Sequence, residues 1–441
     1  MKIRKTSLKI NRHTLPVYLL FGSLLTFSTR GFQEAQENLF NIGNLVRYIA
    51  LPLFYLYTFH LCYKKDLRYI IKSSKALKFL LLYWIIGGIS LLTSKWITYS
   101  LVKWIEYFQL FFLSYYVLNM EIKHREFAIE IYDIIIRFFE FLMLTVLIGF
   151  ILSPSKALYV GNSEFSALKS AAIPFRLSGY LIPVTSTSIG FLSSILLYTY
   201  LVKYNNGEKI KYGLIKIIIS IIFVIIAQAR MAILGLVIAI CVFYLIINKN
   251  ILKKFIFLYT CIFLTFIAGA GIYNILLRGQ DSTQLLSMSG RTEWWSYALD
   301  VYKISDAHEK LFGQGFAGGE KVIAAQSNEA MYTLDSELLG ALMSTGILGT
   351  IFIILAIIAL TCSIIWLTIY IKKNCVNRYK TYINEIVGIM IILIVRMITT
   401  NTFSTLSYYS LIFVSCILVT QTISKEIKYE SRNRKNYNGS I

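Results

Sequence analysis

Apolar stretches long enough to cross a membrane recur along this chain, and they limit its fold more than any other feature. The chain has 441 residues, of which 56% are hydrophobic and 15% are charged. A helix crosses a bilayer with about 20 apolar residues, because it satisfies its backbone polar groups within the segment. We predict an all-α, polytopic integral membrane protein, with residues 1–441 as a single membrane domain. Twelve spans are expected, at residues 14–29, 43–63, 79–93, 99–119, 129–153, 179–202, 213–228, 231–247, 255–276, 338–371, 383–399 and 407–423.

The distribution of basic residues predicts how these spans are oriented. Of the 44 Lys and Arg residues, 29 fall in seven alternate segments, while 11 fall in the segments between them. Cytoplasmic loops carry the excess of Lys and Arg, so these seven segments and both termini are expected inside. The net charge of +21 could also suit nucleic acid, but its confinement to alternate loops favours a membrane orientation and no nucleic-acid partner. The inward segments are 1–13, 64–78, 120–127, 203–216, 248–254, 372–382 and 424–441.

The cysteines predict neither a disulfide framework nor a metal centre. All six lie in spans or in inward segments, and none forms a CxxC pattern or a cluster with histidine. Outward disulfides and a structural zinc site are therefore not expected, and we expect no metal and no cofactor. The six are Cys62, Cys241, Cys261, Cys362, Cys375 and Cys416.

Two outward loops are longer than simple connections need to be. Residues 154–178 form the first, and residues 277–337 form the second, just before the tenth span. Loops longer than about 12–15 residues in a compact protein are usually functional or disordered. Within the second loop, apolar residues recur at helical spacing over Arg291–Ile304, which predicts an amphipathic helix. The apolar run 338–371 exceeds one span, so a short half-buried helix is expected before the span itself begins at Gly346.

Residues 313–318 of the long loop read Gly-Gln-Gly-Phe-Ala-Gly and match the pattern GxGxxG. A dinucleotide site of this kind requires a preceding strand and a helix within a βαβ unit. The match lies instead in an outward loop between helices, where no nucleotide pool exists. We interpret it as a tight turn.

Basic residues near the outer ends of the spans are the first candidate site. Arg176 and Arg230 lie at outer helix ends, and Arg291 opens the loop helix. Arg47 and Arg396 lie within apolar spans, where a charge costs at least about 2.5–3.5 kcal/mol on insertion scales. Converging guanidinium groups suit a diphosphate, because each offers a planar fork of donors. We predict that these five arginines bind a diphosphate.

Neutralisation within a helix is the alternative for cations in the spans. Lys103 has Glu106 three residues later, which predicts an ion pair. Arg47 and Arg396 have no acidic neighbour at helical spacing on their own helices. For these two arginines, snorkelling toward the membrane surface and ligand binding both stay open.

Asp335 is the candidate acid. It ends the long loop directly before a helix that enters the membrane, in Leu334-Asp335-Ser336-Glu337. An Asp at this place can cap the helix by accepting backbone amide hydrogens, or it can act as a general base at the mouth of a membrane cavity. Glu293, two residues after Arg291, is expected to orient that arginine or to take part in catalysis.

Four segments, taken in order over about residues 170–350, resemble the O-antigen ligase and polymerase superfamily. They are Arg176-Leu177-Ser178-Gly179 followed by Pro183 and Gly190; Ala229-Arg230-Met231-Ala232-Ile233-Leu234; Ser289-Gly290-Arg291-Thr292-Glu293-Trp294-Trp295 with Leu311-Phe312-Gly313-Gln314-Gly315-Phe316; and Asp335-Ser336-Glu337 followed by Gly346-Ile347-Leu348-Gly349. Ligases of the family typically have His at the position of Asp335. An Asp there looks more like the Wzy-type polymerases of O-antigen and capsule clusters.

The resemblance implies a membrane glycosyltransferase of GT-C-like architecture in the bacterial cytoplasmic (inner) membrane. Its substrates would be oligosaccharide repeat units on undecaprenyl diphosphate, as glycan donor and as acceptor, and a chain-length regulator could bind as a further partner. The implied reaction joins repeat units into O-antigen or capsular polysaccharide, by inverting transfer in which arginines hold the diphosphate charge without a metal. The alternatives are a polysaccharide ligase and, from another class, a flippase of lipid-linked oligosaccharides. A flippase needs inverted halves, and no repeat relates the halves of this chain.

Overall fold

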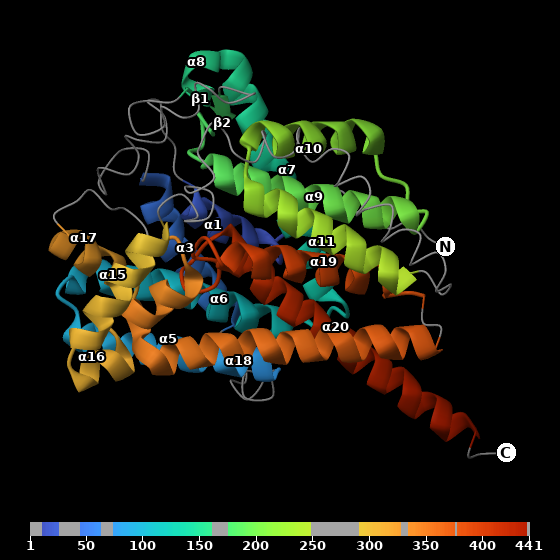
Figure 1. Ribbon diagram of the computed structural model, residues 1–441. Coiled ribbons are helices and arrows are strands. Elements are labelled where there is room, and N and C mark those ends of the chain that lie inside the picture. Colours follow the sequence, from blue (N-terminus) through green and yellow to red (C-terminus); the bar gives the residue numbers. More distant parts are fainter. Residues whose placement is uncertain are drawn as a thin grey trace.

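The computed structural model (Figure 1) describes residues 11–25, 45–62, 74–160, 175–247, 291–327, 334–374 and 377–438, and helices make up most of this described part. Sequential apolar runs become sequential helices, because a helix satisfies its own backbone in an apolar environment. In chain order the helices are α1 (Leu15–Leu24), α3 (Leu45–Cys62), α5 (Lys75–Ile89), η2 (Ser90–Thr93), α6 (Ile97–Met120), α7 (Phe127–Leu152), α8 (Pro154–Ala157), α9 (Ser186–Asn205), α10 (Gly213–Ala227), α11 (Arg230–Ile247), α15 (Arg291–Ile304), α16 (Ala307–Phe312), α17 (Gly319–Ser327), α18 (Glu337–Asn374), α19 (Lys380–Met397) and α20 (Tyr408–Asn438).

Each predicted apolar run that the structure describes contains a helix, although the run 179–202 becomes helical only from Ser186. Eleven of the twelve correspond to α1, α3, α5, α6, α7, α9, α10, α11, α18, α19 and α20, and the run 255–276 lies outside the described residues. Within the described part, five helices are long and apolar enough to cross a membrane, namely Leu45–Cys62, Lys75–Thr93, Phe127–Leu152, Glu337–Asn374 and Tyr408–Glu430. The protein is therefore an integral membrane protein, whereas the number of twelve spans and their orientation stay predictions.

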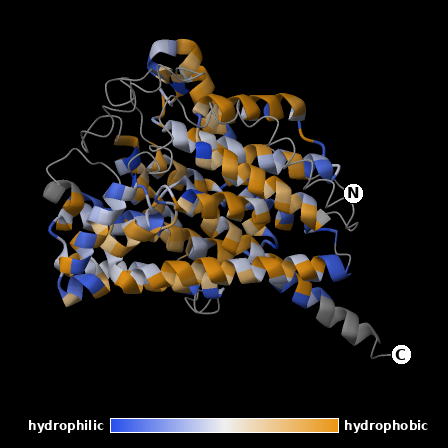
Figure 2. Cartoon of the chain, in the orientation of Figure 1, coloured by the Kyte–Doolittle hydropathy of each residue, from blue (hydrophilic) through white to orange (hydrophobic). Residues whose placement is uncertain are grey.

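Hydrophobic residues dominate the helices of the bundle (Figure 2), and many large apolar side chains are exposed. On α3, Leu56 is 68% exposed, and α10 and α18 present similar rows of isoleucine and leucine. A soluble protein rarely exposes contiguous apolar surface of this extent, whereas lipid chains cover it at no cost. The polar residues of the described spans are mostly directed inward, among them the buried Gln109 and Asn119 of α6.

A break at Gly346 divides α18 into a short first segment and a long second one. Gly346 has φ 66° and ψ −170°, a backbone conformation that essentially only glycine adopts. The expected short helix before the span is thereby confirmed. The second segment packs along α5, and the end of α16 packs against the break (Figure 1).

The helices of the long outward loop, α15, α16 and α17, gather at the end of the bundle opposite to that toward which α20 extends (Figure 1). The predicted amphipathic helix is confirmed as α15, whose Ala298 and Val301 are buried in a small apolar cluster with Ile323, Leu334 and Met343. This cluster fixes α15 and α17 on the first segment of α18. Residues 291–327 of the loop are thus packed against the rest of the protein.

The turn between α16 and α17 contains the residues that match GxGxxG. Gly313 has φ 86°, Gly315 has φ 112° and the amide of Gln314 donates to the Met343 carbonyl of α18 over 2.9 Å. A Cβ on Gly313 would lie 2.4 Å from the backbone of Ser344. The interpretation of this sequence as a tight turn is confirmed. Close packing on the α18 backbone explains Gly313, whereas a Cβ on Gly315 would lie 2.2 Å from the Ser94 Oγ.

The loop 154–178, which is predicted to face outward, contains a two-stranded antiparallel hairpin that the all-α prediction did not include. Strands β1 (Leu158–Val160) and β2 (Phe175–Leu177) pair with Tyr159 opposite Arg176. Residues 161–174 between them lie outside the described part. Segments of three residues are too short to give a period-2 pattern, so the sequence gives no signal for them.

Candidate functional site

An ion pair between Arg291 and Asp335 stands where the long loop returns to the membrane helices. The Arg291 Nε donates to the Asp335 Oδ2 over 3.1 Å, and the two side chains are 29% and 31% exposed. Arg291 begins α15, while Asp335 lies two residues before α18 and has φ 45°. A half-exposed pair of this kind adds little to stability but can meet a ligand from outside. The two residues that the sequence selected from opposite ends of the loop are therefore in contact.

Two further arginines lie on the same side of the bundle. Arg230 begins α11 after the turn at Gln228 and Ala229, and the positive charge of Arg291 acts on it. Arg176 of β2 donates from its Nε to the Ala227 carbonyl at the end of α10 over 3.2 Å, three residues before Arg230. Gln228 donates from its side chain to the Phe175 carbonyl over 2.7 Å, so the hairpin is held on this turn. Arg176, Arg230, Arg291 and Asp335, which we call the arginine cluster, come from four separate elements.

Arg396 is buried at the end of α19 and holds the connection to α20. Its Nη1 donates to the Thr402 hydroxyl over 2.8 Å and also to the Asn401 carbonyl, and its guanidinium lies 3.6 Å from the centre of the Tyr409 ring. The negative charges of Glu337 and Asp335 act on it. Snorkelling does not describe Arg396, because its side chain is buried and bonds to Asn401 and Thr402 inside the protein.

Glu337, the first residue of α18, supports the same connection. Its carboxylate accepts from the backbone amides of Thr402 and Phe403, the latter over 3.0 Å. It is fully buried, as Arg396 nearly is. Buried opposite charges that also bond to backbone groups fix a segment in place, because removing either one leaves the other uncompensated. Residues 398–407 are thereby positioned next to Asp335.

Glu320 on α17 is a site residue that the sequence analysis missed. Its Oε1 accepts from the Asn401 side-chain amide over 2.6 Å and from the Leu334 backbone amide over 3.3 Å. Burial, assisted by the charges of Asp335 and Glu337, raises the pKa of Glu320 to about 7. A carboxyl group with such a pKa beside other carboxylates is typical of functional sites. In the sequence, Glu320 is one acidic residue among several polar residues of the long loop, and no pattern marks it as a site residue.

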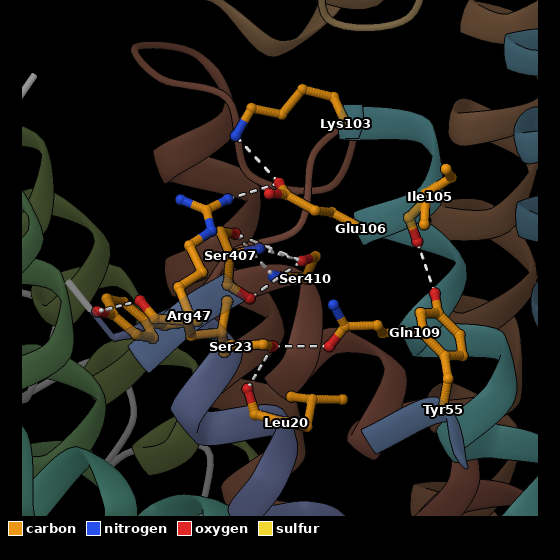
Figure 3. A network of polar contacts seen from close by, with 12 residues as sticks. Leu20, Ser23, Arg47, Tyr55, Lys103, Ile105, Glu106, Gln109, Ser407 and Ser410 are labelled. Atoms are coloured by element: carbon orange, nitrogen blue, oxygen red, sulfur yellow. Dashed lines mark hydrogen bonds and ion pairs between the residues drawn. The ribbon is translucent and has the colours of Figure 1, made fainter. Parts of the chain in front are cut away.

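Arg47 and Lys103 form a second basic group together with Glu106 (Figure 3). The Glu106 Oε2 lies 2.5 Å from the Arg47 Nη2 and 3.0 Å from the Lys103 Nζ. The predicted pair of Lys103 with Glu106 is confirmed. Arg47 has no acidic neighbour on its own helix, and its partner comes from α6. Glu106 is therefore the direct partner of Arg47, and the binding of a diphosphate by Arg47 stays a prediction.

Glu293 lies exposed on the first turn of α15. The carboxylate that the structure brings to Arg291 is that of Asp335. A part for Glu293 in orienting Arg291 stays a prediction.

Comparison with known families gives a match over part of the chain. A family model described as O-antigen ligase (Wzy_C) matches residues 215–354. The matched segment contains Arg230, Arg291, Glu293 and Asp335, whereas Arg47, Arg176 and Arg396 lie outside it. No curated protein matches the chain. Residues 215–354 thus match the O-antigen ligase family model, and the resemblance indicated by the sequence is confirmed over this range.

Proposed function

We propose that this protein is a glycosyltransferase that polymerises undecaprenyl-diphosphate-linked repeat units at the outer face of the bacterial cytoplasmic membrane. The observation that carries the proposal is the Arg291–Asp335 pair beside Arg230, within the segment that matches the O-antigen ligase family. This arrangement combines cations for a leaving diphosphate with a carboxylate for an acceptor hydroxyl. It supports transfer of a glycan from a lipid diphosphate.

The reaction follows from the two kinds of charge in the arginine cluster. The acceptor hydroxyl oxygen forms a bond to the anomeric carbon while the bond from that carbon to the diphosphate oxygen breaks, so the configuration inverts. Asp335 takes the hydroxyl proton. The bonding electron pair leaves with the diphosphate, whose charge is stabilised by Arg176, Arg230 and Arg291. A retaining hydrolase would instead need a second carboxylate as nucleophile.

Unsatisfied polar atoms around the cluster also support a ligand site. Within the described residues, no hydrogen-bond partner is present for the buried Arg396 Nε, Glu337 Oε1 or Asn401 Oδ1. Buried polar atoms are nearly always paired, so such a group points to substrate or water as the missing partner. We assign Arg396 to positioning residues 398–407, because its Nη1 is already bonded to that segment.

Replacing Arg230 with alanine should abolish polymer while leaving the amount of protein in the membrane unchanged. Arg230 is the first residue of α11 and belongs to the arginine cluster. Its replacement therefore removes one of the cations proposed to stabilise the leaving diphosphate. Loss of one such donor lowers kcat by about 10²–10³-fold in other acyl- and group-transfer enzymes. The check is the glycan size ladder together with an immunoblot of membranes. Arg378→Ala is the matched control, since that arginine is 61% exposed and belongs to the predicted inward side. Absence of the protein from the membrane would indicate a structural role instead.

Glu320→Gln should remove a pH dependence of substrate binding. Because the pKa of Glu320 is about 7, the group is neutral below that pH and negative above it. Ionisation adds a negative charge beside the arginine cluster and repels a diphosphate. In the wild type the KM for the lipid-linked donor should therefore rise as the pH passes about 7, and in Glu320→Gln it should stay flat. Asp300→Asn, an exposed acid of α15, serves as control. An unchanged rise in the Gln variant would refute this role.

The experiment that tests the proposed function is the size ladder of surface glycan from a strain that lacks the gene. Single repeat units on the acceptor, with the ladder gone, would support polymerisation. The family description as O-antigen ligase makes a ligase the second candidate, and long polymer accumulating on the carrier lipid would establish it. Precursor trapped on the cytoplasmic side would indicate a flippase and overturn the proposal.

A further inference from the structure

In the second basic group, the cations outnumber the carboxylates that pair with them. Arg47 of α3 and Lys103 of α6 share the single carboxylate of Glu106 (Figure 3). Lys321 of α17 adds a third cation, since its Nζ and the Lys103 Nζ lie 3.9 and 5.8 Å from the centre of the same Tyr99 ring. Two carboxylates, those of Glu106 and Glu320, also act on Tyr99, so the three cations leave an excess of positive charge. In a low-dielectric environment such an excess favours an anionic ligand.

Aromatic rings support this group at the edge of the bundle. The Lys321 Nζ lies 3.9 Å from the centre of the Tyr99 ring and 5.4 Å from that of the Trp96 ring. Trp96 is 45% exposed. Tryptophan and tyrosine at a membrane surface mark the level of the lipid headgroups. The cations therefore lie at the depth where a lipid carries its charge.

The surface next to the three cations is apolar and faces outward from the bundle. On α3 and α6, the residues around Arg47 and Lys103 expose large apolar side chains, namely Leu45, Val46, Ile49, Leu53, Ile97, Leu101, Val102 and Ile105. An anionic headgroup held by the cations would have its chain along this surface. The cations can therefore bind the diphosphate headgroup of a lipid while the apolar surface contacts its hydrocarbon chain.

The start of α20 separates this group from the arginine cluster. The charge of Arg47 acts on Tyr408, while Arg396, beside the cluster, packs on the neighbouring Tyr409. On α17, Glu320 bonds to the Leu334 amide beside Asp335, and the next residue, Lys321, faces Tyr99. The two basic groups are therefore neighbours, with distinct sets of residues.

We propose that Arg47, Lys103 and Lys321 form a second binding site for a polyprenyl diphosphate, which holds the acceptor substrate. The proposal rests on the proposed function, in which the donor diphosphate occupies the arginine cluster. The acceptor reacts through a sugar hydroxyl and keeps its own diphosphate throughout. Its diphosphate therefore needs a site apart from the one where the donor bond breaks.

The test is the number of undecaprenyl diphosphate molecules that the purified full-length protein binds, measured by native mass spectrometry from lipid nanodiscs. The wild type should bind two, and the double variants Arg47→Gln with Lys321→Gln and Arg230→Gln with Arg291→Gln should each bind one. Loss of one charge-assisted hydrogen bond should weaken the affected site by about tenfold or more. Lys303→Gln, an exposed lysine of α15, should still bind two.

Competition experiments show which anion occupies the second site, and a single variant controls for misfolding. Inorganic diphosphate should compete weakly, because it lacks the chain, and phosphatidylglycerol should not displace the second molecule. Displacement by phosphatidylglycerol at equal concentration would reduce the site to a general anionic-lipid contact and overturn the proposal. Because Arg47→Gln leaves Glu106 short of a partner, Lys321→Gln alone is measured as well, and it should weaken only the second molecule.

A wild-type stoichiometry of one would also overturn this inference and leave polymerisation untouched. Failure of the proposed function itself would appear separately, in the glycan ladder of the deletion strain.

Discussion

Asp335→Asn is expected to lower the rate of glycan transfer by about 10²–10⁴-fold, the usual contribution of a positioned general base. The amide has the shape of the carboxylate but takes no proton from the acceptor hydroxyl. Asparagine also tolerates the backbone at this position, where φ is 45°. The variant should therefore be folded, and its Oδ1 can still accept from Arg291. The loss should fall on kcat, with KM for the lipid-linked donor little changed.

The measurement is single-turnover transfer between defined lipid-linked repeat units in nanodiscs. Asp300→Asn removes a carboxylate on α15 that is 62% exposed, and this variant should transfer glycan at the wild-type rate. A normal rate in Asp335→Asn would exclude Asp335 as the base. A raised KM with normal kcat would instead assign it to substrate binding through Arg291.

Gly346→Ala is expected to remove most of the folded protein from the membrane. The backbone there, with φ 66° and ψ −170°, costs a residue with a Cβ about 1–3 kcal/mol. The new Cβ would also lie 2.3 Å from the Leu311 carbonyl oxygen and 2.6 Å from the Phe312 amide nitrogen. Both are backbone atoms, so no side-chain rotation relieves the contact. The end of α16 would be forced away from α18.

Gly207→Ala is the matched control for this substitution. Gly207 also has a positive φ, of 73°, but a Cβ there would have nothing within 4 Å. It should cost only the backbone strain and leave normal amounts of protein. Membrane protein levels and the melting temperature in detergent measure both variants. Equal effects of the two substitutions would show that the contact with α16 does not hold the loop.

The sequence predicted the helices and the residues of the arginine cluster for identifiable physical reasons. Apolar runs can only form helices in lipid, so α7 and α19 are found within a few residues of their expected places. The break at Gly346 was predicted because the run 338–371 exceeds one span. Arg291 and Asp335 were selected because they stand at the start of a loop helix and at the loop's end.

The contacts between elements could not be predicted in the same way. Arg47 and Glu106 are far apart in the chain, and nothing on α3 indicates that its arginine meets α6. Arg396 bonds to backbone and hydroxyl groups of its own connection, which carry no pattern in the sequence. The pKa of Glu320 depends on burial by three elements, so composition gives no sign of it.

The left-handed backbone at Asp335 also has a consequence for which side chains this position admits. Asparagine, aspartate and histidine are the side chains found most often at positive φ, after glycine. Histidine is typical of the ligases that the chain resembles at this position, and it would fit the same φ of 45°. Aspartate and histidine can therefore occupy this position without rebuilding the loop, whereas β-branched residues meet strain. The conformation of this one residue thus admits side chains of different acid–base chemistry while the fold stays the same.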